Sequence, residues 1–141
     1  MIIKIVLLVF IGLEFSNVVA LYFFPGAKMA NAVGVFSAWE KSKQDPEVHD
    51  FVRYLVYWVA GAKLIFLLLL ALIVAFADLT MQRLTLAALA LATVSFFWRM
   101  FPLARKMDRA GQMQPKRYSL VLGAMILALI ALFVISAFIG V

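Results

Sequence analysis

Two ionisable side chains, Glu14 and Lys63, interrupt long apolar stretches of the sequence, and groups of this kind are the first candidates for chemistry. A lone charge at the centre of a bilayer costs about 2.5–3.5 kcal/mol on insertion scales. A carboxylate and an ammonium group at similar depth should therefore approach each other inside a helix bundle. The pair would be either a structural contact that fixes the register of two helices or a site for a proton, an ion or a polar headgroup.

Other polar side chains could join Glu14 in a pocket. Asn17 lies on the same helical face as Glu14, one turn further along. Tyr57 should reach this depth from the second apolar stretch, and Thr93 and Ser95 from the third. We therefore predict a polar binding pocket that opens toward the basic loops and is formed by Glu14, Asn17, Tyr57, Lys63, Thr93 and Ser95.

The sequence gives little support for a metal or cofactor site. His49 is the single histidine, and the chain has no cysteine. One imidazole among the carboxylates of Asp45, Glu47 and Asp50 makes a poor transition-metal site without a second His or Cys. Acidic residues at a helix start are explained by the helix dipole. We predict no metal, no cofactor and no catalytic residue, because phosphate-loop and nucleophile motifs are also missing.

The amino-acid composition indicates whether these residues are surrounded by water or by lipid. Of the 141 residues, 67% are hydrophobic and 14% are charged, and the mean hydropathy is +1.07. An ordinary soluble domain is about half apolar and a quarter charged. The sequence therefore excludes a soluble domain and a disordered chain, and it predicts an all-α integral membrane protein. Helices are favoured over strands because the apolar runs are continuous and lack polar alternation.

Four segments approach the roughly 20 apolar residues that a helix needs to cross a bilayer core. We predict one domain, residues 1–141, in which four transmembrane helices form an up-down bundle over residues 5–24, 51–77, 79–98 and 118–141. Glu14 argues against a cleaved signal peptide, so the first segment should be retained as a span.

Local sequence signals predict where these segments begin and how they are connected. Asp45 followed by Pro46 predicts the start of the second helix, and Gln114-Pro115 predicts that of the last one. The connection Asp78-Leu79-Thr80 is so short that the second and third helices should be antiparallel neighbours. Apolar residues at three- and four-residue steps predict a short interfacial amphipathic helix over Met29–Trp39, and Leu103–Arg109 should form another.

The basic residues predict the orientation. The net charge is +6, and loop 25–50 carries three Lys or Arg residues while loop 99–117 carries six. By the positive-inside rule both loops should be cytoplasmic and both termini outside, in a multi-pass protein of the cell membrane. We expect anionic lipid headgroups to contact a set of loop cations: Lys41, Lys43, Arg105, Lys106, Arg109, Lys116 and Arg117.

These features favour a small non-catalytic membrane protein, an accessory or structural subunit that packs in a larger membrane complex or with itself. One alternative is a transporter or channel component that uses Glu14 and Lys63. Another is a lipid- or hydrophobe-binding protein or enzyme. The expected partners are membrane lipids and a membrane protein or a second copy. Nucleic acid is not expected, because no recognition motif is present.

Overall fold

The computed structural model describes residues 2–29 and 31–139, and within this part of the chain every regular segment is helical. Among these residues, four stretches are long and apolar enough to cross a membrane: Ile2–Phe23, Pro46–Phe76, Leu79–Arg109 and Tyr118–Phe138. In chain order the helices are α1 (Ile2–Phe23), the 3-10 turn η1 (Val33–Val35), α2 (Ser37–Ser42), α3 (Pro46–Phe76), α4 (Leu79–Val94), the 3-10 turn η2 (Ser95–Phe97), α5 (Met100–Arg109) and α6 (Tyr118–Ile139). The apolar segments predicted from the sequence therefore correspond to α1, α3, α4 with η2, and α6, except that residues 140–141 of the last predicted segment lie outside the described residues.

Carboxylate caps fix where three of these helices begin. Asp45 accepts hydrogen bonds from the backbone N–H groups of Glu47 (3.1 Å) and Val48 (3.3 Å), so the predicted start of α3 is confirmed. Asp78 caps α4 in the same way. The start predicted at Gln114-Pro115 is wrong. The last helix begins only at Tyr118, because Asp108 of α5 accepts hydrogen bonds from backbone N–H groups in its first turn.

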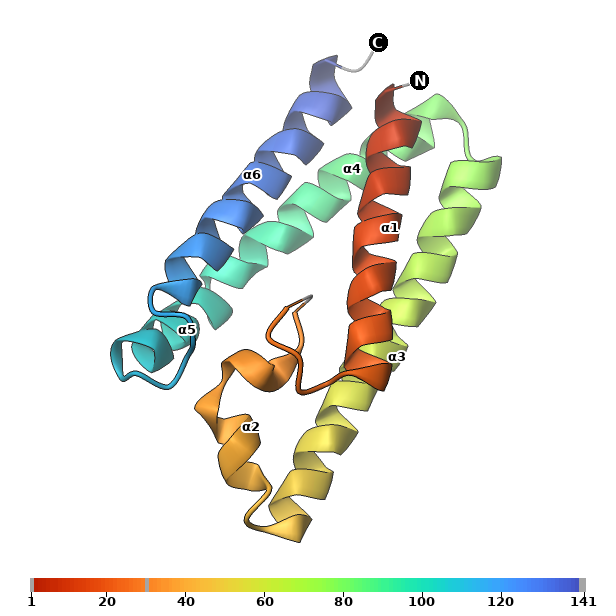
Figure 1. Cartoon of the computed structure of the whole chain (residues 1–141). Coiled ribbons are helices and arrows are strands. Elements are labelled where there is room, and N and C mark those ends of the chain that lie inside the picture. The colour runs from red at the N-terminus through yellow and green to blue at the C-terminus, as the bar shows by residue number, and fades with distance from the viewer. Residues whose placement is uncertain (1, 30, 140–141) are drawn as a thin grey trace.

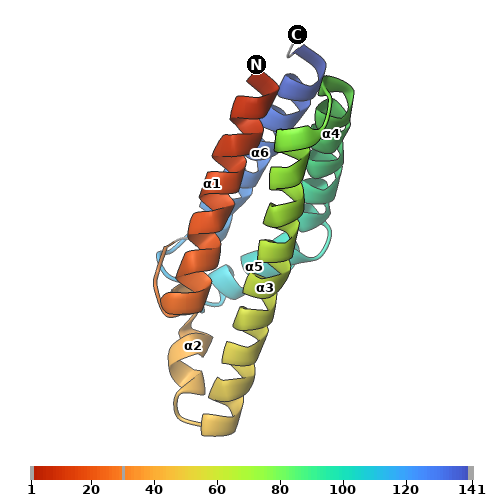
Figure 2. The same cartoon turned by 90° about the vertical axis from the view of Figure 1, so that its right-hand side faces the viewer.

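The long helices are arranged as two pairs. α1 packs mainly against α3, and α4 packs mainly against α6. Both termini and the α3–α4 turn lie at one end of the molecule, whereas α2 and α5 lie at the other (Figures 1 and 2). Only Ala77 and Asp78 connect α3 to α4, yet these two helices diverge from the turn and touch at few positions. The prediction that they are close neighbours is wrong over most of their length, since each packs against another apolar helix.

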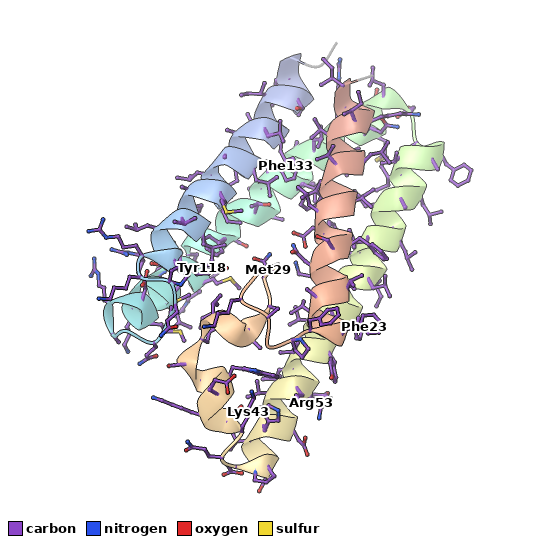
Figure 3. All side chains as sticks on the ribbon, viewed as in Figure 1. Phe23, Met29, Lys43, Arg53, Tyr118 and Phe133 are labelled. Atoms are coloured by element: carbon purple, nitrogen blue, oxygen red, sulfur yellow. The ribbon has the colours of Figure 1, made fainter. Side chains whose placement is uncertain are left out.

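The core lies at the end that carries the termini, where all four long helices converge. Phe133 is completely buried there, and its ring contacts that of Phe10 edge to face with a centroid distance of 5.1 Å (Figure 3). Such pairs are a favourable arrangement for buried aromatic rings. The buried cluster around them comprises Ile3, Val6, Leu7, Phe10, Leu70, Val74, Leu86, Leu89, Ala90, Phe133 and Ala137.

The opposite end is joined by the two long loops. The backbone N–H of Ser37 donates to the carbonyl of Gln112 (2.9 Å), and that of Gln114 donates to the carbonyl of Val35 (2.8 Å). These bonds form an isolated antiparallel bridge between Phe36 and Met113. The loops therefore tie the α1–α3 pair to the α4–α6 pair at the end that lacks the main core.

The first loop differs from the predicted amphipathic helix over Met29–Trp39. Only η1 and the short α2 form, because the backbone N–H groups of Val33 and Gly34 donate to the carbonyls of Pro25 and Ala27 and turn the segment back on itself. The helix predicted over Leu103–Arg109 is present within α5.

A candidate binding cleft between α1 and α6

A cleft of about 580 Å³ lies between α1 and α6. The two helices share the core near the termini but contact each other at few positions, so the space between them is not filled by the chain. The wall formed by α6 is apolar and includes Val121, Met125 and Leu129. Phe10 and Leu13 extend the apolar lining on the side of α1. A volume of this size falls within the roughly 300–1,000 Å³ of pockets that bind small ligands.

The wall formed by α1 carries a polar patch. Lys63 of α3 donates a hydrogen bond from Nζ to Glu14 Oε2, and Asn17 Nδ2 donates to Glu14 Oε1 at 3.3 Å. Glu14 and Asn17 share a face because they are three residues apart on α1, and both line the cleft. The side chains of Glu14 and Lys63 are only 18% and 28% exposed. The structure thus brings together these three of the six residues predicted to form a pocket.

The polar patch is electrically neutral but retains hydrogen-bonding capacity. The carboxylate and the ammonium group balance each other at close contact. The Oδ1 atom of Asn17 receives no hydrogen bond from the part of the chain that the structure describes, so it can accept one from a ligand. Ser16 also lines the cleft, and its hydroxyl donates to the carbonyl of Leu13.

Two further polar residues mark the end of the cleft near the loops. Asn31 comes from the first loop and has a φ of +56°, a left-handed conformation that Asn adopts more readily than most residues. Tyr118 is the first residue of α6 and lines the cleft with a half-buried side chain. Figure 3 labels Tyr118, together with Met29 in the loop that turns back toward the helices. An amide and a phenol group therefore lie at the polar end of a largely apolar space.

Lys63 contacts Glu14 from α3 but does not itself line the cleft, and neither do the other three predicted pocket residues. The Tyr57 ring stacks on Tyr22 with a centroid distance of 6.0 Å, and its hydroxyl accepts a hydrogen bond from Arg53. Thr93 donates to the carbonyl of Leu89, and Ser95 donates to that of Ala92. Hydroxyl groups on helices commonly bond to the preceding turn in this way. The second wall comes from α6 and not from α4, so Thr93 and Ser95 lie outside this cleft.

Sequence reasoning missed Asn31, Tyr118 and the whole apolar wall of α6. A polar residue in a loop and a tyrosine at a helix start are visible in the sequence, but neither shows that α6 faces α1. Because α6 is apolar on every side, its sequence gives no preferred face from which a neighbour could be inferred.

The cations predicted to contact headgroups divide into separate groups. Lys43 is paired with Glu40 at 2.8 Å, and Lys41 and Lys106 are exposed. The guanidinium group of Arg105 donates to the Ser119 hydroxyl at 3.2 Å. A second, smaller hollow beside α5 is lined by Arg105 together with the three remaining cations, Arg109, Lys116 and Arg117.

His49 has a structural environment. Its Nδ1 atom lies 2.9 Å from the Ser42 hydroxyl, and its ring lies 4.8 Å from that of Trp39, so it packs α2 against α3. Within residues 2–29 and 31–139, no group of three or more His, Cys, Asp or Glu side chains could hold a metal ion.

Comparison of the chain with protein-family models, with curated proteins and with solved structures found no match.

Proposed function

We propose that this protein binds a lipid-like molecule with an uncharged, hydrogen-bonding head group in the cleft between α1 and α6. The observation that carries the proposal is the combination of an apolar wall on α6 with a neutral polar patch on α1, where Glu14 is held by Lys63 and Asn17. A hydrocarbon chain would lie along Val121, Met125 and Leu129. A hydroxyl group would donate to Asn17.

The proposal includes the placement of the chain in a membrane. The four long apolar helices form an up-down bundle across the bilayer, with both termini outside and loops 25–50 and 99–117 in the cytoplasm. Two observations support this orientation. The termini and the α3–α4 turn lie at one end of the molecule (Figure 1), and nine of the thirteen Lys and Arg residues belong to the two loops at the other. Glu14 and Lys63 then lie within the hydrocarbon region, where pairing lowers the cost of each charge.

In the proposed site, the polar patch selects ligands by their head group. An apolar chain gains little when it moves from lipid into an apolar cleft, because lipid tails are as apolar as the cleft wall. A hydroxyl group, in contrast, has few partners in hydrocarbon and gains one at Asn17. A charged head group is disfavoured, since Glu14 and Lys63 already neutralise each other.

Ligand binding is favoured over the subunit and transport functions by a specific feature, the polar patch on α1 opposite the apolar wall of α6. Binding rather than turnover is proposed because the Glu14 carboxylate is engaged by two side chains.

Photolabelling in phosphatidylcholine nanodiscs tests the proposal. The probe is a long-chain alcohol that carries a diazirine, and the labelled peptide is identified by mass spectrometry. We expect label on α1 and α6 that unlabelled oleyl alcohol displaces. Met125→Trp should remove most of this label by filling the cleft.

A matched variant on the same helix controls for general effects of a new tryptophan. Leu127 is 57% exposed and does not line the cleft, so Leu127→Trp should keep the label. Label spread evenly over the exposed faces of the helices, or equal labelling of the two variants, would show that the cleft is not the binding site.

A further inference from the structure

We propose a second binding site, which recognises a phosphate group carried by a membrane lipid, in the hollow between the end of α5 and the start of α6. This hollow has a volume of about 370 Å³ and is lined by four cationic side chains, those of Arg105, Arg109, Lys116 and Arg117. It lies apart from the cleft, and the inference rests on the proposed membrane placement but not on ligand binding in the cleft.

The cations in the hollow are largely available to a ligand. Among the residues that the structure describes, the side chains of Arg109, Lys116 and Arg117 form no ion pair with a carboxylate, and all three residues are exposed. Arg and Lys groups converging on one small volume repel each other, and an anion between them removes that repulsion. A phosphate group suits this arrangement because Arg can bind two of its oxygens at once while Lys contributes a compact charge.

The single acid in the hollow, Asp108, is already satisfied. Its carboxylate accepts hydrogen bonds from the backbone N–H groups of Arg117 (3.1 Å) and Ser119 (3.0 Å) and from the Ser119 hydroxyl. The Arg105 guanidinium lies 4.0 Å away from it. With a side chain only 5% exposed, Asp108 holds the α5–α6 junction in place and offers little repulsion to an anion.

The local backbone sets the shape of the hollow. Gly111 has a φ of +70° and Arg117 a φ of +66°, so the chain reverses sharply on both sides of the segment between α5 and α6. These turns bring Arg109 at the end of α5 and Lys116 before α6 to the same hollow, although they are seven positions apart. Leu120 adds an apolar edge to the hollow, and its side chain is 45% exposed. A lipid fits this mixed lining better than a free anion does, because its phosphate group would lie among the cations while its acyl chains continue past Leu120 along α6.

Native mass spectrometry of the full chain in detergent tests this site, with phosphatidic acid as the probe and phosphatidylcholine as the comparison lipid. We expect preferential binding of phosphatidic acid. Arg109→Gln and Lys116→Gln should each weaken it roughly fivefold, and the double variant roughly 25-fold, if each cation contributes as basic residues near an anionic membrane do. Lys116→Arg should retain binding. Neither original side chain makes an ion pair in the described part of the chain, and each is repelled by its cationic neighbours, so the substitutions should not lower the melting temperature.

Lys106→Gln is the matched control, because Lys106 is an exposed cation of α5 outside the hollow. It should bind phosphatidic acid like the wild type. Competition with inorganic phosphate shows whether the ligand is a lipid or a free phosphate. If the site binds a lipid, millimolar inorganic phosphate should fail to displace phosphatidic acid. Displacement at that concentration would show that the site recognises the phosphate group alone and would contradict the lipid assignment. Wild-type affinity in the double variant, or an equal loss in Lys106→Gln, would overturn the site in favour of general attraction to a basic surface.

Discussion

Breaking the ion pair between Glu14 and Lys63 should destabilise the fold, and removing both charges should restore most of the loss. Glu14→Gln keeps the size of the side chain and its contact with Asn17 but leaves the ammonium group of Lys63 without its partner. In the proposed membrane placement this charge lies at mid-depth, where an unpaired charge costs about 2.5–3.5 kcal/mol. Lys63 is 28% exposed and can turn in part toward polar surroundings, so we expect a loss of about 2 kcal/mol rather than the full value.

The double variant separates the energy of the ion pair from the effects of losing either side chain alone. Lys63→Met in the background of Glu14→Gln removes the unpaired charge and keeps an unbranched side chain of similar length. Its stability should return to within about 1 kcal/mol of the wild type. Lys63→Met alone leaves the carboxylate of Glu14 unpaired and should also cost about 2 kcal/mol, so the cycle should give a coupling energy of about 3 kcal/mol. The assay is reversible unfolding by sodium dodecyl sulfate in mixed micelles, followed by circular dichroism.

An exposed carboxylate provides the control for this cycle. Asp50 has a side chain that is 77% exposed and lies 3.8 Å from Arg53, so Asp50→Asn should change stability by less than about 1 kcal/mol. A loss in Glu14→Gln no larger than that in Asp50→Asn, with additive effects in the double variant, would refute the argument that the pair is shielded from water.

Two further predictions concern the loop end of the molecule. Asp108→Asn should lower the unfolding free energy by about 2 kcal/mol, because it weakens charge-assisted hydrogen bonds from the α6 start and from Ser119; unchanged unfolding in the same mixed micelles would contradict this. Gly26→Ala should cost about 1–3 kcal/mol, since an added Cβ would lie 2.6 Å from the Trp39 indole nitrogen. In Gly12→Ala the new methyl group meets nothing within 4 Å, so melting curves should show a variant at least as stable as the wild type, in contrast to Gly26→Ala.

The features that could be predicted from the sequence are those set by local geometry. The rise of 1.5 Å per residue places Glu14 and Lys63 at similar depth on antiparallel helices, and this depth together with the cost of an unpaired buried charge predicts their approach. Asp45 followed by Pro46 specifies a helix start through contacts within three residues, so the cap of α3 was also predictable.

The features that could not be predicted depend on which helices are neighbours. α1 and α6 are apolar on most faces, so no stripe in either sequence identifies its partner. The sequence therefore predicts a pocket that includes Thr93 and Ser95, whereas the cleft is lined mainly by residues of α1 and α6. The cap from Asp108 to Ser119 crosses from one helix to the next over eleven positions. No local rule connects two such residues, and Pro115 gave the stronger but incorrect signal for the helix start.

The most direct test of the proposed function compares two ligands that differ only in the hydroxyl group. The affinities of oleyl alcohol and oleyl methyl ether for the wild type are measured by displacement of the diazirine probe in nanodiscs. A hydrogen bond to Asn17 of about 1 kcal/mol predicts roughly fivefold tighter binding of the alcohol, and the difference should disappear in Asn17→Leu. Equal affinities of the two molecules for the wild type would contradict recognition of a polar head group by the α1 wall of the cleft.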